Sequence, residues 1–511
     1  MSTSRRDFLK ALGLTGAALS VPGAAAALPA SARRASAVTV TGRVAGPDGG
    51  IEGVAVTDGV SVTQTGADGR YELAASARRP FVYLSVPAGY QLPTHDTGTA
   101  QIYRRLDATG GGTATASFRL APLDRSDEEH AVLFLADPQA RTKAEMRQFR
   151  DETVPDVRRT VKQLGDRPVV GVGGGDLVFD DLSLFSGYER AVRQMGIPFV
   201  QVVGNHDLNF DAAADPGSTA TFRRHFGPEY YSFDRGAVHY VVLDDVYWPG
   251  SDGFGRETDD YLGHLPATQL QWLAQDLSLV EDGRPVVVLT HIPPLSTLYD
   301  RRGEASPSVR GQIGNRAALY ELLDPFDAHI VSGHVHENEH RVADGPHEHV
   351  VGTACGAWWT GPVCYDGTPK GYAVYEASGT SVRWRYKSVG HDADHQMRVY
   401  PAGADPDAPD EVIANVWDAT GDWTVVWYED GIRAGRMTRR TGVDPLSRRL
   451  HEGDDRPEKH PWVNPQPTDH LYYAPANPDA NRVRVEATDA FGRTYVGRPE
   501  DHVPPAGSSS G

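Results

Sequence analysis

Five apolar runs in the middle of the chain each end in polar side chains that can bind a metal ion. These side chains are Asp137 and Gln139, Asp176, Asn205 and His206, His291, and His334 and His336. Ligands of open α/β sheets bind outside the carboxyl ends of the strands, so all five groups should meet at one sheet edge. Carboxylate and amide oxygens mixed with imidazoles suit Mn, Fe or Zn better than Ca or Mg. The pattern therefore predicts a transition-metal site.

The sequence around these residues predicts the elements that position them. Apolar runs such as "AVLFLAD", "PFVQVVGNHD" and "PVVVLTH" alternate with helical patterns such as "TKAEMRQFRDETVPDVRRTVKQL". Near-continuous Val, Ile and Leu strands between helices are typical of a sheet that is buried on both faces. We expect this α/β domain to span residues 128–390.

The order of the motifs D-x-Q, GGD, GNHD, TH and GHxH, from about Ala131 to Lys387, resembles the calcineurin-like metallophosphoesterase superfamily. The resemblance implies a four-layer α/β/β/α sandwich that holds two divalent metal ions, Mn, Zn or Fe, with Mg as a further option. Carried over by motif, the first metal would be held by Asp137, Gln139 and His336, the second by Asn205, His291 and His334, and both by the bridging Asp176.

The same resemblance gives the "GNHD" stretch a catalytic role. It implies that His206 faces the substrate and that Asp207 orients the His206 ring. Two cations about 3.5–4 Å apart lower the pKa of a bridging water and clamp both oxygens of an in-line displacement at phosphorus. The resulting hydroxide would attack the phosphoryl group, and His206 would stabilise or protonate the leaving oxygen.

The sequence departs from the family pattern at Gln139, where the first motif usually carries a histidine. An amide oxygen is a weaker and harder donor than imidazole, so we expect weaker binding of the first metal, a preference for Mn or Mg over Zn, or contact through water. Phe179 stands where the purple acid phosphatase branch has a metal-bound tyrosine. That branch is therefore excluded.

A loop rich in glycine and aromatic residues, "CGAWWTGPVCYDGTPKGY", follows the last metal motif. Long loops in compact domains are often functional. Trp358 and Trp359 are predicted either to wall the substrate pocket or to pack in the core. Cys355 and Cys364 are the only cysteines, and an oxidising compartment would favour a disulfide between them; two free buried thiols are the alternative.

The N-terminal residues 1–37 predict a twin-arginine export signal. Arg5 and Arg6 precede an apolar stretch from Phe8 to about Val21, and Ala30-Ser31-Ala32 offers a cleavage point. We therefore expect an extracellular or periplasmic protein. No later segment approaches the length of a membrane span.

One further domain is predicted on each side of the α/β domain. Short strand-like runs and turn signals from 38 to 122 predict a small β-sandwich. A linker rich in proline and aspartate leads into a second β-rich region, residues 410–503. Three domains agree with a length of 511 residues, which exceeds what one core supports.

Charge and motifs together limit the function. A net charge of -18 argues against nucleic acid as the main partner. The leading hypothesis is an exported dinuclear-metal phosphoesterase that hydrolyses mono- or diesters of a small or surface-displayed organic phosphate. The alternatives are a nucleotidase or cyclic-nucleotide phosphodiesterase, and a non-catalytic extracellular binding protein with structural metals. The sequence does not indicate the oligomeric state.

Overall fold

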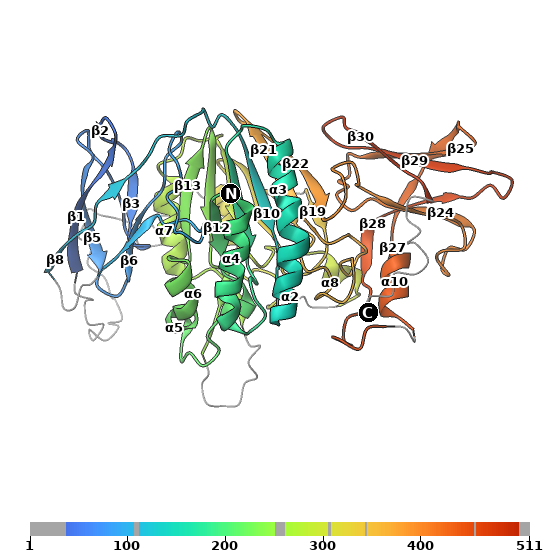
Figure 1. The fold of residues 1–511 in the computed structure, drawn as a ribbon, viewed down its shortest axis with the longest axis horizontal. Coiled ribbons are helices and arrows are strands. Elements are labelled where there is room, and N and C mark those ends of the chain that lie inside the picture. Colours follow the sequence, from blue (N-terminus) through green and yellow to red (C-terminus); the bar gives the residue numbers. More distant parts are fainter. Residues whose placement is uncertain are drawn as a thin grey trace, which may run out of the picture.

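The computed structural model describes residues 37–106, 112–250, 261–304, 308–342, 345–453 and 456–499. The predicted export signal lies outside the described residues, except for its last position. Three regions follow one another along the long axis of the molecule: strands at one end, an α/β region in the middle, and more strands at the other end (Figure 1).

The N-terminal region consists of two small sheets. In the first, β1 pairs antiparallel with β2 and β5 and parallel with β8 and β9; the second has the order β4-β3-β6-β7. Buried and exposed residues alternate along β5, so one face of that strand points into the core. The strands are β1 (Ala37–Gly46), β2 (Gly49–Gly50), β3 (Ala55–Thr57), β4 (Val62–Gln64), β5 (Arg70–Ser76), β6 (Phe81–Leu84), β7 (Tyr103–Arg105), β8 (Gly112–Thr115) and β9 (Phe118–Arg119).

The middle region contains two larger sheets. The first, in the order β12-β11-β10-β21-β22, is built from β10 (Glu129–Leu135), β11 (Val169–Gly174), β12 (Phe199–Val202), β21 (Gly371–Ser378) and β22 (Ser381–Ser388). The second, in the order β13-β14-β17-β18-β20-β19, is built from β13 (Tyr231–Arg235), β14 (Val238–Val242), β17 (Pro285–Leu289), β18 (Asp327–Ser332), β19 (Glu339–Arg341) and β20 (His347–Val350). A short ladder joins β15 (Val246–Tyr247) and β16 (Leu262–Gly263).

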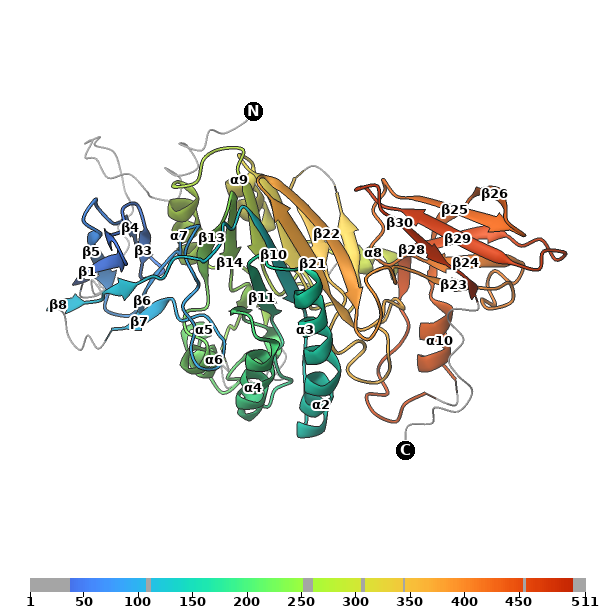
Figure 2. The ribbon, with the colours of Figure 1, turned by 45° about the horizontal axis from the view of Figure 1, so that its top comes forward.

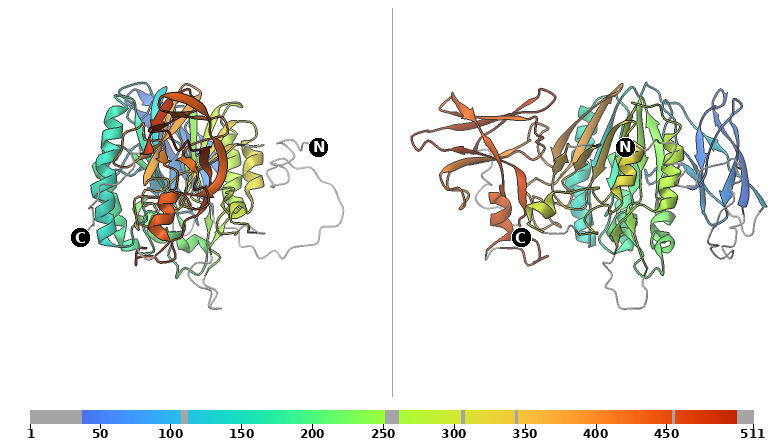
Figure 3. Two further views of the ribbon diagram at one scale, coloured as in Figure 1. Left: turned by 90° about the vertical axis from the view of Figure 1, so that its right-hand side faces the viewer. Right: turned by 180° about the vertical axis from the view of Figure 1, so that it is seen from behind.

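Helices cover the outer faces of both sheets (Figure 3). Those over the first sheet are α2 (Lys143–Gln148), η1 (Phe149–Thr153), α3 (Val154–Gln163) and α4 (Phe185–Met195); those over the second are α7 (Ala267–Leu277) and α9 (Arg316–Leu323). The other helices of the described middle region are η2 (Leu182–Leu184), η3 (Asn205–Asp207), α5 (Asp215–Ser218), α6 (Ala220–His225) and α8 (Leu298–Arg301).

The burial of β10 explains why the two sheets stack. Val132 and Phe134 belong to the core between the sheets, whereas Leu133 and Leu135 belong to the core under the helices. Successive side chains of a strand point to opposite faces, so a strand that is apolar at every position is covered on both sides. The predicted four-layer α/β/β/α sandwich is confirmed.

The C-terminal region again forms two sheets, in the orders β23-β24-β28-β27 and β26-β25-β29-β30, and lies beside β22 (Figure 2). Its elements are β23 (Arg398–Tyr400), β24 (Glu411–Asn415), β25 (Thr424–Glu429), β26 (Ile432–Arg436), β27 (Thr438–Val443), α10 (Pro445–His451), β28 (Pro467–Pro475), β29 (Val483–Thr488) and β30 (Thr494–Gly497). Its first strand begins twelve residues before the predicted boundary at 410. Among the described residues, none of the helices combines the length and hydropathy that crossing a membrane requires.

Candidate metal centre

The five polar motifs lie at the carboxyl ends of strands on one edge of the stacked sheets. Asp137 follows β10, Asp176 follows β11, and Asn205 opens η3 after β12. His291 follows β17, and His334 follows β18. The arrangement expected from the sequence is therefore present, with ligands contributed by both sheets.

Contacts join the predicted ligands into one continuous group. His291 Nε2 lies 3.3 Å from Asp176 Oδ1 and 3.0 Å from Asn205 Oδ1, and His334 Nδ1 lies 3.2 Å from His291 Nε2. The backbone N–H of His334 donates to Asp137 Oδ2 at 3.0 Å. The ligand atoms of Asp176, His291 and His334 all lie within 4.8 Å of one another.

The imidazoles are held so that one nitrogen of each faces the site. His291 Nδ1 bonds the Gly174 carbonyl at 3.0 Å, which leaves its Nε2 for the site. His336 Nδ1 bonds the Gly356 carbonyl at 2.7 Å in the same way. A backbone acceptor on one ring nitrogen fixes the tautomer of a metal-binding histidine and its orientation.

Two buried atoms of this group have no hydrogen-bond partner. They are Asp137 Oδ1 and His336 Nε2, which lie 3.6 Å apart. Buried polar atoms are nearly always satisfied, so this pair calls for a missing partner. A cation between a carboxylate oxygen and an imidazole nitrogen would satisfy both. The residues therefore fit a first ion at Asp137 and His336 and a second at Asp176, Asn205, His291 and His334.

Buried carboxylates and imidazoles lie side by side in the site, and they shift one another's pKa values. Burial alone would lower the pKa of His291, but the Asp176 carboxylate outweighs burial and raises it to about 10. Burial, with a contribution from the Asp176 carboxylate, raises the pKa of Asp137 to about 7, although His291 opposes this shift. Burial lowers the pKa of His336 to about 4, so its imidazole is neutral, the form that binds metal ions.

The backbone around the centre is strained. Ten non-glycine residues of the described chain have positive φ, and five of them are predicted ligands: Asp137, Gln139, Asp176, His334 and His336. Such conformations cost about 1–3 kcal/mol each and gather at functional sites. Glycines allow the close approach, since a Cβ on Gly175 would lie 2.4 Å from His291 Nδ1 and one on Gly333 would lie 2.4 Å from Asp137 Oδ2.

Gln139 contacts Asp176, the predicted bridging ligand, through its amide nitrogen. Its Nε2 donates to Asp176 Oδ2 at 2.9 Å, and its Oε1 lies 3.8 Å from the Cys355 thiol. In this orientation the side chain holds Asp176 in place. Its amide oxygen would have to turn away from Cys355 to act as the predicted ligand.

His206 lies at the mouth of the site, and its orientation corrects one prediction. His206 Nδ1 lies 2.7 Å from Asp180 Oδ1, and the His206 ring stacks on Phe179 with centroids 4.1 Å apart. Asp207 was expected to orient the ring, but its carboxylate instead accepts backbone N–H groups of Leu177, Val178 and Gly204. Asp207 therefore braces the turn, and Asp180 orients His206.

The surroundings of His206 favour its charged form. Burial would lower the pKa of His206, but Asp176 and Asp180 outweigh burial and raise it. The backbone N–H of His206 also donates to Asp176 Oδ1 at 2.8 Å, which ties the residue to the metal ligands. Nδ1 of His206 is bonded to Asp180, and Nε2 is the other ring nitrogen.

The tryptophans of the long loop have different surroundings. Trp358 stacks on His336 with ring centroids 3.9 Å apart. Trp359 is 7% exposed, belongs to the core under the helices, and donates from Nε1 to the Pro138 carbonyl. Trp359 thus follows the core-packing alternative, and Trp358 covers a predicted metal ligand.

The predicted disulfide is absent from the structure. Cys355 and Cys364 are both free and buried. The two sulfurs lie 3.6 and 3.7 Å from the Thr353 hydroxyl, so both thiols contact the same side chain. The alternative of two free buried thiols is the one observed.

A groove of about 630 Å³ borders the site and involves the C-terminal region. Its lining includes Arg141, Lys459, His460 and Trp462. The Arg141 guanidinium lies 5.3 Å from the centre of the Phe179 ring, and the His460 ring lies 6.1 Å from it. The groove therefore adjoins the aromatic ring under His206. Sequence reasoning missed these residues because they carry no motif.

Sequence models for three parts of one family match the chain. The N terminal of Calcineurin-like phosphoesterase matches residues 38–123, Calcineurin-like phosphoesterase matches 130–338, and the C terminal of Calcineurin-like phosphoesterase matches 348–495. The chain belongs to the calcineurin-like phosphoesterases that carry these N- and C-terminal domains.

Individual similar proteins are more distant. A cAMP/cGMP dual specificity phosphodiesterase of Mycobacterium tuberculosis is 25% identical over 217 residues, which cover 40% of this chain and only 60% of that relative. A dimetal phosphatase from Danio rerio is 14% identical over 51% of this chain and 96% of that one, with a TM-score of 0.36. A purple acid phosphatase from yellow lupin (Lupinus luteus) seeds is 14% identical over 50% and 51% of the two chains, with a TM-score of 0.35.

Proposed function

We propose that this protein hydrolyses phosphate esters with two divalent metal ions and with His206 as the residue that assists the leaving oxygen. The observation that carries the proposal is the His206 arrangement. Its ring is stacked on Phe179, and its Nδ1 is bonded to Asp180 beside the metal ligands. A purely structural metal site has no use for an oriented imidazole that is not a ligand.

Under this proposal, the residues of the site have defined roles. Bound divalent ions would supply activation of water and neutralisation of phosphoryl charge. Asp176 would help to hold both ions, and its Oδ1 accepts the backbone N–H of His206. The Asp180 carboxylate stabilises the imidazolium, so the proton on His206 Nε2 can pass to the oxygen that leaves phosphorus.

Steady-state hydrolysis tests this function. The full-length protein is stripped with a chelator, reloaded separately with Mn²⁺, Zn²⁺ or Mg²⁺, and assayed with p-nitrophenyl phosphate and bis-p-nitrophenyl phosphate. We expect turnover that depends on the added metal, and the ratio of the two rates ranks monoester against diester activity. Metal-loaded protein that hydrolyses neither ester would favour the binding-protein alternative.

A cyclic-nucleotide phosphodiesterase is the second candidate. The 25% identical relative is named for cAMP and cGMP, and the groove beside His206 carries an aromatic side chain, Trp462, which is 49% exposed. A base stacked on an exposed aromatic ring gains about 1–3 kcal/mol. Trp462→Ala should then raise KM for cAMP but leave KM for p-nitrophenyl phosphate unchanged. Equal KM changes for both substrates would oppose the base-binding role.

Export by the twin-arginine route is part of the proposal. It is supported by the Arg5 and Arg6 pair ahead of an apolar stretch. The double variant Arg5→Lys, Arg6→Lys keeps the charge and should leave the protein in the cytoplasm. Fractionation that finds wild type and variant in the same compartment would argue against this route.

A further inference from the structure

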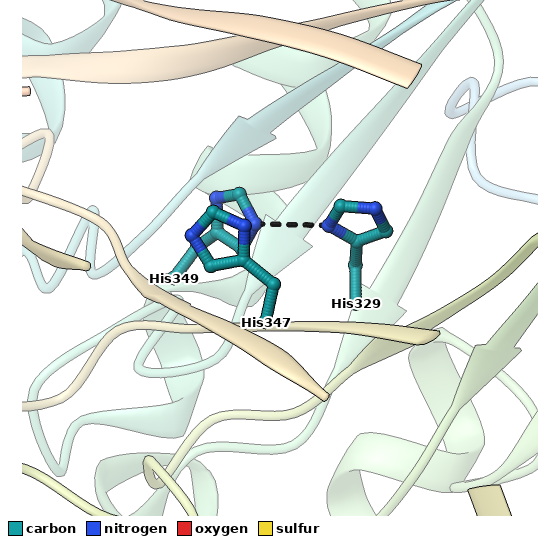
Figure 4. A group of neighbouring side chains, drawn as sticks. All are labelled: His329, His347 and His349. Atoms are coloured by element: carbon teal, nitrogen blue, oxygen red, sulfur yellow. Dashed lines mark hydrogen bonds between the residues drawn. The ribbon is translucent and has the colours of Figure 1, made fainter. Parts of the chain in front are cut away.

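Four histidines gather outside the phosphoesterase centre, where β18, β19 and β20 pair. His329 on β18 lies opposite His347 on β20, and His340 on β19 lies opposite His349 on β20. His347 and His349 are two positions apart on one strand, so both side chains point to the same face. Figure 4 shows the side chains of His329, His347 and His349 close together on that face.

The nitrogen atoms are spaced as metal ligands are. His329 Nδ1 lies 3.1 Å from His349 Nε2, and one ligand atom from each of His329, His347 and His349 lies within 4.8 Å of the others. Nitrogens that bind a tetrahedral zinc ion at about 2.0–2.1 Å are about 3.3 Å from each other. A small closing movement of His347 would complete a three-nitrogen set.

Burial lowers the pKa of His329, His347 and His349 and so disfavours their protonated form. Burial and the neighbouring His340 and His329 lower the pKa of His347 to about 2. Burial and the other histidines lower the pKa of His349 in the same way. His349 is 1% exposed, and its Nδ1 is buried without a hydrogen-bond partner, so hydrogen bonds among the rings do not satisfy the cluster.

A carboxylate from the C-terminal region supports the cluster. Asp418 Oδ1 lies 2.7 Å from His340 Nε2, and His340 Nδ1 lies 3.3 Å from His347 Nε2. A carboxylate behind a histidine orients the ring at metal sites and supplies counter-charge. Trp384 packs edge-on against His347 and His349, with centroids 4.8 and 4.6 Å away, and limits access by water.

We propose that His329, His347 and His349 form a third metal site, which binds a single divalent transition metal such as Zn²⁺ separately from the phosphoesterase centre. An all-imidazole set suits Zn, Cu or Ni and disfavours Mg and Ca, unlike the mixed oxygen and nitrogen set of the catalytic residues. His340, fixed by Asp418, is a positioning residue. The site joins the edge of the second sheet to the C-terminal region and does not require the protein to be a phosphoesterase.

Zinc content measures the site directly. The full-length protein is stripped with EDTA, incubated with excess Zn²⁺, gel-filtered and analysed by mass spectrometry of the metal. We expect His347→Gln and His349→Gln each to carry one zinc ion fewer per chain than the wild type, whereas His391→Gln, an exposed histidine outside the cluster, should carry as many as the wild type. Hydrolysis by the His347→Gln variant should equal that of the wild type.

The outcomes separate the two proposals. Equal zinc content in folded His347→Gln and wild type would overturn the third site, as would an equal loss in His391→Gln. Thermal unfolding shows whether each variant folds. If His349→Gln does not fold, His347→Gln alone decides whether the third site exists, because His347 is only half-buried. A missing zinc ion in His347→Gln supports the third site even if the wild type hydrolyses no ester.

Discussion

Replacing Asp180 with asparagine tests whether Asp180 orients the His206 ring and stabilises its protonated form. The Asp180 side chain is 45% exposed, and its Oδ1 lies 2.7 Å from His206 Nδ1. A hydrogen bond that involves a charged group contributes about 1.5–3 kcal/mol. Because the pair is partly exposed, we take the lower end, about 1.5 kcal/mol. Since about 1.4 kcal/mol corresponds to a factor of ten, kcat should fall about tenfold with little change in KM.

The assay is steady-state hydrolysis of the better nitrophenyl ester by metal-loaded protein. Asp181→Asn is the matched control, because the neighbouring Asp181 carboxylate bonds Ser183 and caps η2. Its kcat should stay within about twofold of the wild type, as expected for a surface substitution away from the reacting groups. On a His206→Ala background, Asp180→Asn should have almost no further effect, because residues that act through one another are not additive. A tenfold loss on that background as well would refute the orienting role.

Three further predictions concern other parts of the molecule. Burial would lower the pKa of His239, but the Asp276 and Asp234 carboxylates outweigh burial and raise this pKa to about 9. The stabilisation of the fold by protonated His239 is therefore complete below about pH 6.5 and is lost as the pH rises through 9. The loss of unfolding free energy in His239→Gln should therefore shrink by about 3 kcal/mol between pH 6 and 10 in urea titrations; a constant difference would contradict the pairing. Unfolded protein prepared without reductant should react with two equivalents of a thiol reagent, whereas a disulfide would leave none. Gln139→His should tighten Zn²⁺ binding in competition with a chelator, because imidazole is a better zinc ligand than an amide oxygen, and unchanged affinity would show that this position does not contact the ion.

The shared location of the predicted metal ligands could be foreseen because each follows an apolar strand. Asp137, Asp176 and His291 each stand two positions beyond the last residue of a buried strand, and parallel strands bring their carboxyl ends to one edge. The same strands indicated a sheet covered on both faces, since residues such as Leu133 and Phe134 are apolar on both faces of β10, whereas the four-layer arrangement was expected from the family resemblance. Buried strands and the polar residues at their ends are features of local pattern.

The partners of those ligands depend on contacts that no local pattern carries. Asp180 and His206 are 26 positions apart in the sequence, and they come into contact where Asp180 adopts a positive φ. His329 and His349 lie close together because of the register in which β18 pairs with β20. This register cannot be predicted from the residues between the two strands. The two cysteines are near in sequence, yet Thr353 lies against both sulfurs, so proximity along the chain was misleading.

His206→Ala, with metal content measured on the same samples, tests the central claim most directly. General acid catalysis contributes about 10²–10⁴-fold, so the variant should lose that much kcat for nitrophenyl ester hydrolysis. Its metal content should equal that of the wild type, because His206 is not among the predicted ligands. Undiminished turnover in a fully metal-loaded His206→Ala protein would contradict the role assigned to this residue.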